Sequence, residues 1–158
     1  MGGDADDYDA WARASSADVA HVAVRPRWVG PGTVGVIVAM AGPRAPTAAE
    51  VAAVAAWIDP RRPVTAEVIV LGATLLPVPL SVRAVPDTSA VRASIATAVA
   101  AFFAAEAALG GVIRLSRLRE AISGAGGEVS HDLTVPATDV APTPTQLPVP
   151  GPITWLPP

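Results

Sequence analysis

Three adjacent residues, Ser130, His131 and Asp132, are of the types that form a hydrolytic triad, in which a base activates a serine and a carboxylate orients the base. Their spacing argues against this chemistry. A triad is assembled by geometry from separate elements, whereas neighbours on an extended strand point to opposite faces. We therefore interpret His131 as a solvated strand position, and we expect His21 on the outward face of another strand.

Two further motifs resemble ligand sites but lack essential parts. The acidic segment DADDYD, residues 4–9, has the carboxylates of a calcium loop without its glycine at the sixth position or its glutamate at the twelfth. The glycines of GAGG, residues 124–127, follow an expected helix, whereas phosphate-binding glycines lead into a helix N-terminus. Glu50, Glu106 and Glu120 are each explained by a helix surface. The sequence thus predicts no catalytic residue, cofactor site or metal site.

The composition excludes several other chemistries. The chain contains no cysteine, and all 11 basic residues are arginine, so thiolate and Schiff-base chemistry are both absent. The net charge is −3 and the arginines are scattered, so the sequence has no nucleic-acid-binding footprint. The N-terminus is acidic, unlike a secretory signal, and the longest uncharged helical run, residues 93–105, is shorter than the ~20 residues of a membrane span. We expect a soluble protein with no nucleic-acid, membrane or small-molecule partner.

Large apolar and arginine side chains near the ends of elements are more suggestive of protein contacts, because aromatic residues and arginine are enriched at interface centres. Arg61 and Arg62 lie between two prolines and should project from a rigid turn. Solvated arginines and a core position for Trp57 remain the alternatives. The candidate interface residues are Trp57, Arg61, Arg62, Arg117, Arg119 and Trp155.

The first half of the chain predicts a ββαβ module. Residues 1–7 are interpreted as a disordered leader, followed by a short helix with Trp11 as its anchor. Alternating residues from 19 to 28 and an apolar run after Gly32 predict an antiparallel hairpin. Thr47 and Glu50 have the spacing of a capping box, which predicts a helix that ends at Asp59–Pro60. A strand over residues 64–71 completes the module.

The second half predicts the order β-α-β-α-β-β. A strand ends before Pro86, and a long helix capped by Asp87 or Thr88 follows, with a buried stripe at Val91, Ile95, Val99 and Phe102. A short strand is expected over residues 110–115, then a helix capped by Ser116 and ended by Gly124, then a strand over 128–136. The proline-rich segment that follows is expected as an extended arm with a final strand at 153–155.

Two prolines two residues apart interrupt the strand LLPVPLSVR. Residues two apart direct their N–H groups to the same lateral side of a strand, so Pro77 and Pro79 remove donors from one side only. Leu76, Val78 and Leu80 keep their donors for the other side. We therefore expect residues 76–82 to form an edge strand that is protected from uncontrolled strand addition.

Together these elements predict an α+β protein with two small modules of ferredoxin-like character. The expected divisions are a leader with a short helix (1–18), a first module (19–72), a second module (73–135) and a proline-rich C-terminal arm (136–158).

The order and wording of several segments resemble the C-terminal half of the Baseplate J-like family, wedge proteins of contractile phage tails. These segments run in family order over residues 7–156 and are DYDAWA, VRPRWVGPGTVGVIVA, WIDPRRPVTAEVIV, LPVPLSV, GGVIRLSRLREAIS and ITW. The resemblance implies a non-enzymatic role in the virion baseplate, with assembly in the bacterial cytoplasm. It also implies contacts with other wedge proteins and with copies of the chain. Family members are longer, so we expect this chain to be a fragment.

Two alternatives of other classes remain open. One is a ferredoxin-like regulatory domain that binds a small ligand. The other is a tail-associated cell-wall hydrolase.

Overall fold

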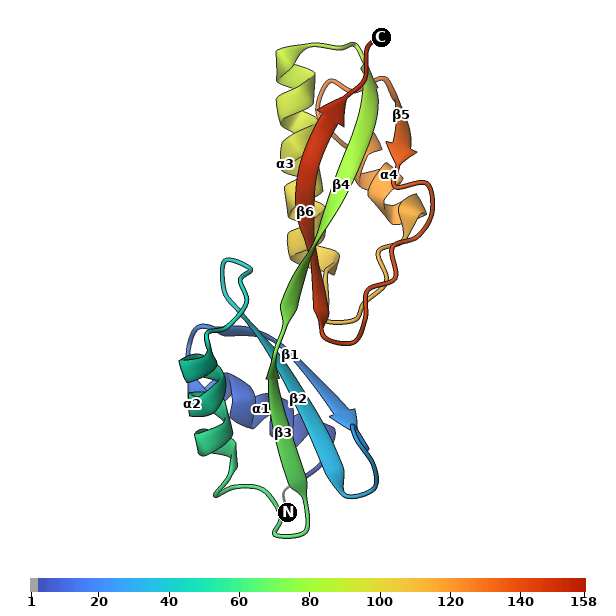
Figure 1. Ribbon diagram of the computed structural model, residues 1–158. Coiled ribbons are helices and arrows are strands. Elements are labelled where there is room, and N and C mark those ends of the chain that lie inside the picture. The colour runs from blue at the N-terminus through green and yellow to red at the C-terminus, as the bar shows by residue number, and fades with distance from the viewer. Residues whose placement is uncertain (1–2) are drawn as a thin grey trace. The chain divides into compact units, whose positions relative to one another are not determined.

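The computed structural model describes residues 3–158 and divides into two compact units (Figure 1). Unit 1 contains the chain up to Leu75 together with Thr145–Leu147, and unit 2 contains Leu76–Pro144 and Pro148–Pro158. Both units combine helices with a three-stranded sheet, so the predicted α+β class is confirmed.

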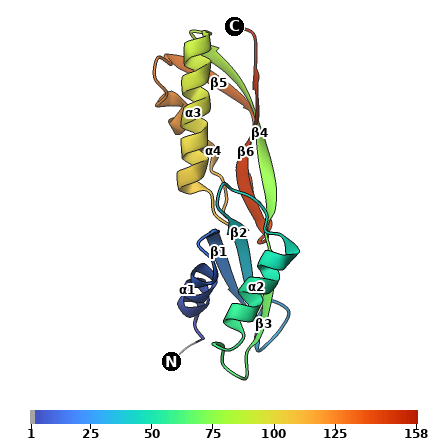
Figure 2. The same cartoon turned by 90° about the vertical axis from the view of Figure 1, so that its left-hand side faces the viewer.

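Unit 1 has the predicted ββαβ order, preceded by a helix. Its elements are α1 (Ala5–Ser15), β1 (Val19–Pro26), β2 (Thr33–Met40), α2 (Ala48–Ile58) and β3 (Glu67–Gly72). The strand order is β1-β2-β3. β1 and β2 are antiparallel, which confirms the predicted hairpin, and β2 and β3 are parallel. The central strand β2 is an almost continuous apolar run because both of its faces are buried. The two helices lie on the same side of the sheet (Figure 2).

The interpretation of residues 1–7 as a disordered leader is wrong for residues 4–7; its first two residues lie outside the described part of the chain. Asp4 is the N-cap of α1 and forms a capping box with Asp7, so the acidic segment begins a helix. Tyr8 and Ala12, one turn apart, are fully buried, while Trp11 packs edge-on against Tyr8 from a half-buried position. The anchor of α1 is therefore mainly Tyr8.

Helix α2 forms as its sequence predicts. Thr47 accepts a hydrogen bond from the backbone of Glu50, and the Glu50 carboxylate accepts one from the backbone of Thr47. Val54 and Ile58 are buried against the core of the sheet. Val51 is half-buried, so the fully buried face of α2 consists of Val54 and Ile58.

Unit 2 has the order β-α-α-β-β. Its elements are β4 (Thr74–Val85), whose first two residues belong to unit 1, α3 (Ser89–Glu106), α4 (Leu115–Ser123), β5 (Ser130–Val135) and β6 (Gln146–Trp155). The expected strand over residues 110–115 is wrong. Only Ile113 pairs there, through two backbone bonds with Val140, because Gly110–Gly111 and the start of α4 leave no room for a longer ladder.

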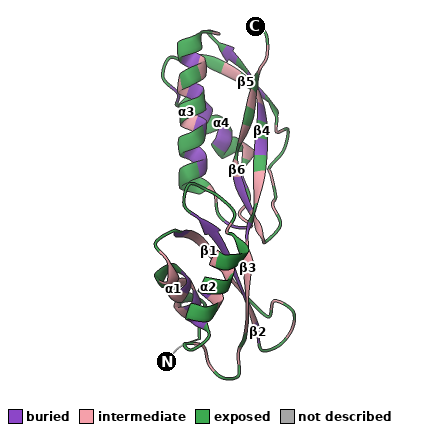
Figure 3. Cartoon of the chain, turned by 60° about the vertical axis from the view of Figure 1, so that its left-hand side comes forward, coloured by how far each residue is buried: buried purple, intermediate pink, exposed green. Residues whose placement is uncertain are grey.

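The core of unit 2 lies between the sheet and its two helices. Thr88 caps α3, and the predicted stripe of Val91, Ile95, Val99 and Phe102 is buried (Figure 3). It packs with Leu80 and Val82 of β4 and with Leu118 and Ile122 of α4. By length and composition alone, α3 could also cross a membrane, a test that core helices of folded domains pass as well.

The prediction that residues 76–82 form an edge strand is wrong, because β4 is the central strand of the order β5-β4-β6. Its pairing with β5 begins at Ser81, which is opposite Val135. The carbonyl of Val82 accepts from Leu156 at the end of β6, and the carbonyl of Val85 accepts from Val129 beside β5. Even-numbered residues of β4 thus direct their backbone groups toward β6 and odd-numbered residues toward β5. Pro77 and Pro79 therefore lack donors on the β5 side, in a stretch that β5 does not reach.

The edge strand that contains prolines is β6. It runs in the same direction as β4 (Figure 1), and Pro148, Pro150 and Pro152 fall within it. Proline is tolerated at a sheet edge because no neighbour needs its missing donor. The final strand, predicted only over residues 153–155, therefore extends from Gln146 to Trp155.

The N-cap predicted for α4 is also wrong. The helix begins at Leu115, and Arg114 at the cap position makes no capping bond with its side chain. Instead, Asp139 from a distant segment accepts a 2.8 Å bond from the backbone N–H of Leu115 and a 2.8 Å bond from Arg114 Nη1. The bond from Leu115 and the Arg114 guanidinium lower the pKa of Asp139 below its usual range. The predicted helix end at Gly124 is confirmed.

We predict that Asp139→Ala lowers the melting temperature and frays the first turn of α4, because Leu115 loses its hydrogen-bond acceptor. The matched control is Ser116→Ala, which removes the cap suggested by sequence and should have the smaller effect. Thermal denaturation followed by circular dichroism ranks the two variants. Equal or inverted effects would show that Asp139 does not cap this helix.

Gly151 of β6 lies against the backbone of β4. A Cβ atom added at this position would be 2.6 Å from the carbonyl carbon and oxygen of Val78 and 2.7 Å from the nitrogen of Pro79. Real Cβ contacts are never this short, so Gly151→Ala should push the two strands apart and destabilise unit 2 by about 1–3 kcal/mol.

Gly126→Ala is the control for this prediction, since its added Cβ would have the Ser94 hydroxyl as its nearest neighbour, at 3.8 Å. We expect it to change the unfolding free energy by about 0.5 kcal/mol or less. Urea denaturation followed by NMR signals of α3 reports on unit 2 alone. A Gly151→Ala variant as stable as Gly126→Ala would refute the close approach of β6 to β4.

Candidate interaction surfaces

Trp57 and Arg61 form an exposed pair at the C-terminal end of α2. The Arg61 guanidinium carbon lies 3.8 Å from the centre of the Trp57 ring, and Arg61 Nη1 donates to the backbone carbonyl of Trp57. The tryptophan remains 39% exposed. This stacking holds a large aromatic group and a cation in one place on the surface, which limits the entropy lost when a partner binds.

Arg62 has a different role from its neighbour. Its Nε donates to Asp59 Oδ1 at 2.8 Å, and its Nη1 donates to the backbone carbonyl of Ala66. Only 29% of its side chain is exposed. Arg62 therefore closes the turn between α2 and β3, with its Nη2 group still able to donate to a further acceptor.

The two candidate arginines of α4 are engaged within unit 2. Arg117 forms ion pairs with Glu106 at 2.6 Å and with Glu120 at 2.7 Å. Both carboxylates raise the pKa of the Arg117 guanidinium, and Glu106 has the larger effect. Arg119 Nη2 lies 3.5 Å from the carbonyl of Leu133 in β5. Both side chains connect α4 to neighbouring elements.

Trp155, near the C-terminus, packs partly against the core of unit 2. The guanidinium carbon of Arg92 lies 5.4 Å from its ring centre, and Arg92 makes a two-pronged contact with Asp87. Of the six candidates, Trp57 and Arg61 are thus brought together on the surface. The other four make separate contacts within the chain.

The structure separates the three residue types that resembled a triad. His131 is largely buried, with 9% of its side chain exposed, and its Nδ1 lies 2.8 Å from Glu128 Oε1. Ser130 and Asp132 are exposed. The expectation of a solvated His131 is wrong, because Glu128 three residues earlier provides a buried partner. That spacing was visible in the sequence, although the burial of the pair was not.

No group of three or more acidic, histidine or cysteine side chains suited to a metal ion occurs among residues 3–158. The glycine-rich segment GAGG ends α4, with Gly124 at the C-cap and Gly127 at φ +83°. A left-handed conformation of this kind is typical of a turn glycine.

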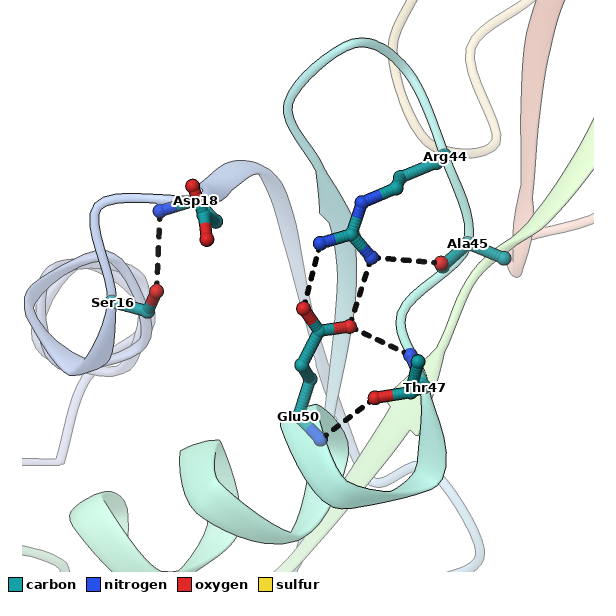
Figure 4. A network of polar contacts seen from close by, with 6 residues as sticks. All are labelled: Ser16, Asp18, Arg44, Ala45, Thr47 and Glu50. Carbon is teal, nitrogen blue, oxygen red and sulfur yellow. Dashed lines mark hydrogen bonds and ion pairs between the residues drawn. The ribbon is translucent and has the colours of Figure 1, made fainter.

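A network of charged groups fixes the start of α2, and sequence reasoning missed its arginine (Figure 4). Arg44 Nη1 and Nη2 contact the two carboxylate oxygens of Glu50 at 2.9 and 2.6 Å, while Thr47 donates its backbone N–H to Glu50. The contact with Arg44 and the bond from Thr47 lower the pKa of Glu50 to about 2. The same contact raises the pKa of Arg44.

Each unit has a surface hollow of its own. In unit 1 a hollow of 280 Å³ lies between α2 and the edge strand β3, and it is lined by Ala55, Ala56, Asp59, Arg62, Val68 and Val70. In unit 2 a hollow of 420 Å³ lies between α3 and the end of α4, lined by small residues such as Ala98, Ala101 and Gly124. Both volumes lie at or near the lower end of the ~300–1,000 Å³ range that is typical of ligand pockets.

The two units coincide with two domains of one phage-tail family. A profile of the Baseplate J-like central domain matches residues 1–72, and a profile of the Baseplate J-like protein C-terminal domain matches residues 78–156. The gap between the two matches contains the division between the units at Leu75.

The chain therefore belongs to the Baseplate J-like family. The assignment to the C-terminal half alone is corrected, because unit 1 corresponds to the central domain. The chain is 37% identical over 78 residues to the protein JayE of Escherichia coli (strain K12), a match that covers 49% of this chain and 30% of JayE. The comparison thus spans about a third of that relative.

We predict that the Arg44–Glu50 contact makes stability pH-dependent in acid. The pKa of Glu50 is lowered from 4.5 to about 2 by folding, so its carboxylate stabilises the protein fully above pH 4.5. This stabilisation should disappear as the pH falls from 4.5 through about 2. Melting temperatures of the native chain and Glu50→Gln should therefore differ at pH 7 and converge near pH 2.

Arg44→Ala provides the control, since Arg44 is the largest cause of the lowered pKa. In the Arg44→Ala background, the same Glu50→Gln substitution should show a smaller pH-dependent effect. A difference that stays constant from pH 7 to pH 2 would contradict this account of the contact.

Proposed function

We propose that this chain is a structural component of a contractile-tail baseplate that takes part in wedge assembly through protein–protein contacts. The observation that carries the proposal is that both units match domains of the Baseplate J-like family, in family order. We further propose that its partners are other wedge proteins and copies of itself, that it resides in the virion baseplate, and that it reaches the baseplate from the bacterial cytoplasm.

The side chains support a role without catalysis. His131 is held by Glu128 away from Ser130 and Asp132, and the carboxylates of Glu50 and Asp139 serve as helix caps. A catalytic acid or base needs a free position beside a substrate. These groups are instead committed to the fold, so we propose that the chain acts through its surface.

The exposed pair of Trp57 and Arg61 is the contact that we propose for partner recognition in unit 1. Truncation of a tryptophan or arginine at an interface centre often costs about 2 kcal/mol or more, which is roughly a thirtyfold loss of affinity. The exposed ring and the cation stacked on it provide such a centre.

We predict that the tagged chain, produced together with neighbouring tail genes, co-purifies with other wedge proteins. The variants Trp57→Ala and Arg61→Ala should lower the recovered amount, because each removes one half of the stacked pair. Quantitative mass spectrometry of the eluate measures both effects. Arg13→Ala, which removes a surface ion pair with Asp9 in the same unit, is the control and should leave recovery unchanged.

Failure of the native chain to recover any wedge protein would contradict the proposed function. Recovery that is insensitive to Trp57→Ala and Arg61→Ala would keep the baseplate role and move the contact away from this pair.

A further inference from the structure

The outer side of β3 has a row of backbone groups without a neighbouring strand. β3 is at the edge of the order β1-β2-β3. Glu67 and Ala73 donate their N–H groups to Gly32 and Val38 on the β2 side. Since the register between β2 and β3 is regular, the odd-numbered residues of β3 face β2 and the even-numbered residues face outward. The outward row therefore consists of the N–H and C=O groups of Val68, Val70 and Gly72.

One end of this row is closed, and the helix-facing side of the other end is covered. At one end, the outward carbonyl of Ala66 accepts a hydrogen bond from Arg62. At the other end, Pro46 and Val51 cover the helix-facing side of Gly72, where an added Cβ would be 2.9 and 3.3 Å from them. The open stretch begins after Ala66 and includes the two donors and two acceptors of Val68 and Val70, within a part of the chain that is fully described.

A hollow of 280 Å³ runs beside the same stretch, between α2 and β3. Its apolar lining comes from Ala55, Ala56, Val68 and Val70, and Arg62 and Asp59 stand at one end. An extended peptide can add to an exposed strand edge where pockets accept its alternate side chains. Here the edge of β3 lies beside α2, and Arg62, which is paired with Asp59, lies at one end of the hollow. The hollow is too small for a folded partner to enter.

We propose that the edge of β3 binds an extended segment of another protein by strand addition. The segment pairs with the backbone of Val68 and Val70, places two small apolar side chains two residues apart against α2, and brings a carboxylate to Arg62 Nη2. The paired donors and acceptors supply affinity, and the alternate side chains supply specificity. This inference deepens the proposed function by giving a binding mode, and it relies on that function only for the partner's identity.

A second copy of this chain fits the edge of β3 and its hollow less well than a separate segment does. In antiparallel pairing of two β3 strands centred on Ile69, Val68 would face Val70 of the copy and Ala66 would face Gly72. The Arg62 end would then meet a glycine, which carries no carboxylate. A separate segment with an acidic residue can instead place a carboxylate beside Arg62 at that end of the hollow.

Hydrogen exchange of the full chain tests whether the row is open. We expect the amides of Val68 and Val70 to exchange rapidly in the free protein, while those of Ile69 and Leu71 are protected by bonds to β2. Equal protection of all four amides would overturn the proposal, because the outward row would already be occupied.

The binding probe is an acetylated and amidated seven-residue peptide of alternating threonine and valine, with two valines two residues apart and glutamate at both ends. Titration should shift the NMR signals of Val68, Val70 and Ala56 and slow exchange of the two outward amides. Replacement of the glutamates by glutamine should weaken binding about two- to fivefold, as for an exposed ion pair.

Two N-methylated forms of the probe serve as matched controls. One carries methyl groups on its valine nitrogens and the other on its threonine nitrogens, so each blocks one lateral side of the peptide. Strand addition uses one side, so one form should bind like the parent and the other at least tenfold more weakly.

Absence of saturable binding, equal binding of both N-methylated forms, or shifts elsewhere on the protein would overturn the proposal. Protection of Val68 and Val70 that grows with protein concentration, together with a dimer in sedimentation, would assign the edge to a second copy and likewise overturn it. These outcomes are independent of recovery of wedge proteins, so failure of the binding mode is distinguishable from failure of the baseplate role.

Discussion

Both sheets are governed by one constraint: each strand has two lateral rows of backbone N–H and C=O groups, and each row must be paired, shielded or exposed to water. In unit 2, β4 directs one row to β6 and the other to β5. Its prolines at 77 and 79 lie where the second row has no neighbour, and β6 carries three prolines at the sheet edge. Unit 1 has no proline within β3, which leaves the outward row at Val68 and Val70 able to pair. The two units therefore manage their edges differently.

The charged side chains are used mainly to hold local geometry. Glu50 caps α2 and pairs with Arg44, Asp139 caps α4 from a separate segment, and Arg117 connects two carboxylates. A group held in this way has its hydrogen-bonding capacity largely satisfied, so it is a poor catalytic acid or base. The polar network and the family assignment thus support the same kind of role, one based on surfaces.

The features predicted correctly from sequence are those set by residues close together in the chain. The capping box of Thr47 and Glu50, the buried stripe of α3 and the end of α4 at Gly124 each depend on one element and its flanks. The position of β4 could not be predicted, because proline shows only that a row lacks donors and not how far a neighbouring strand extends. The same limit applies to Asp139, since a cap 24 residues from Leu115 leaves no local pattern. For the candidate site, the spacing of Trp57 and Arg61 placed both near a helix end, but the burial and internal contacts of Arg62 and Trp155 depended on the fold.

The turn after α2 contributes an arginine to each of the two candidate surfaces of unit 1, the exposed Trp57–Arg61 pair and the edge of β3 with its hollow. Arg61 folds back over Trp57, while Arg62 extends to the carbonyl of Ala66 at the end of the hollow between α2 and β3. Pro60 and Pro63 flank these arginines and restrict the backbone, so the two side chains diverge from a stiff turn. Because α2 also lines this hollow through Ala55 and Ala56, a small shift of its last turn would change both the Trp57–Arg61 pair and the hollow. The capping network at Arg44 and Glu50 fixes the opposite end of this helix, and a rigid α2 is therefore the physical requirement for both surfaces to keep their shape.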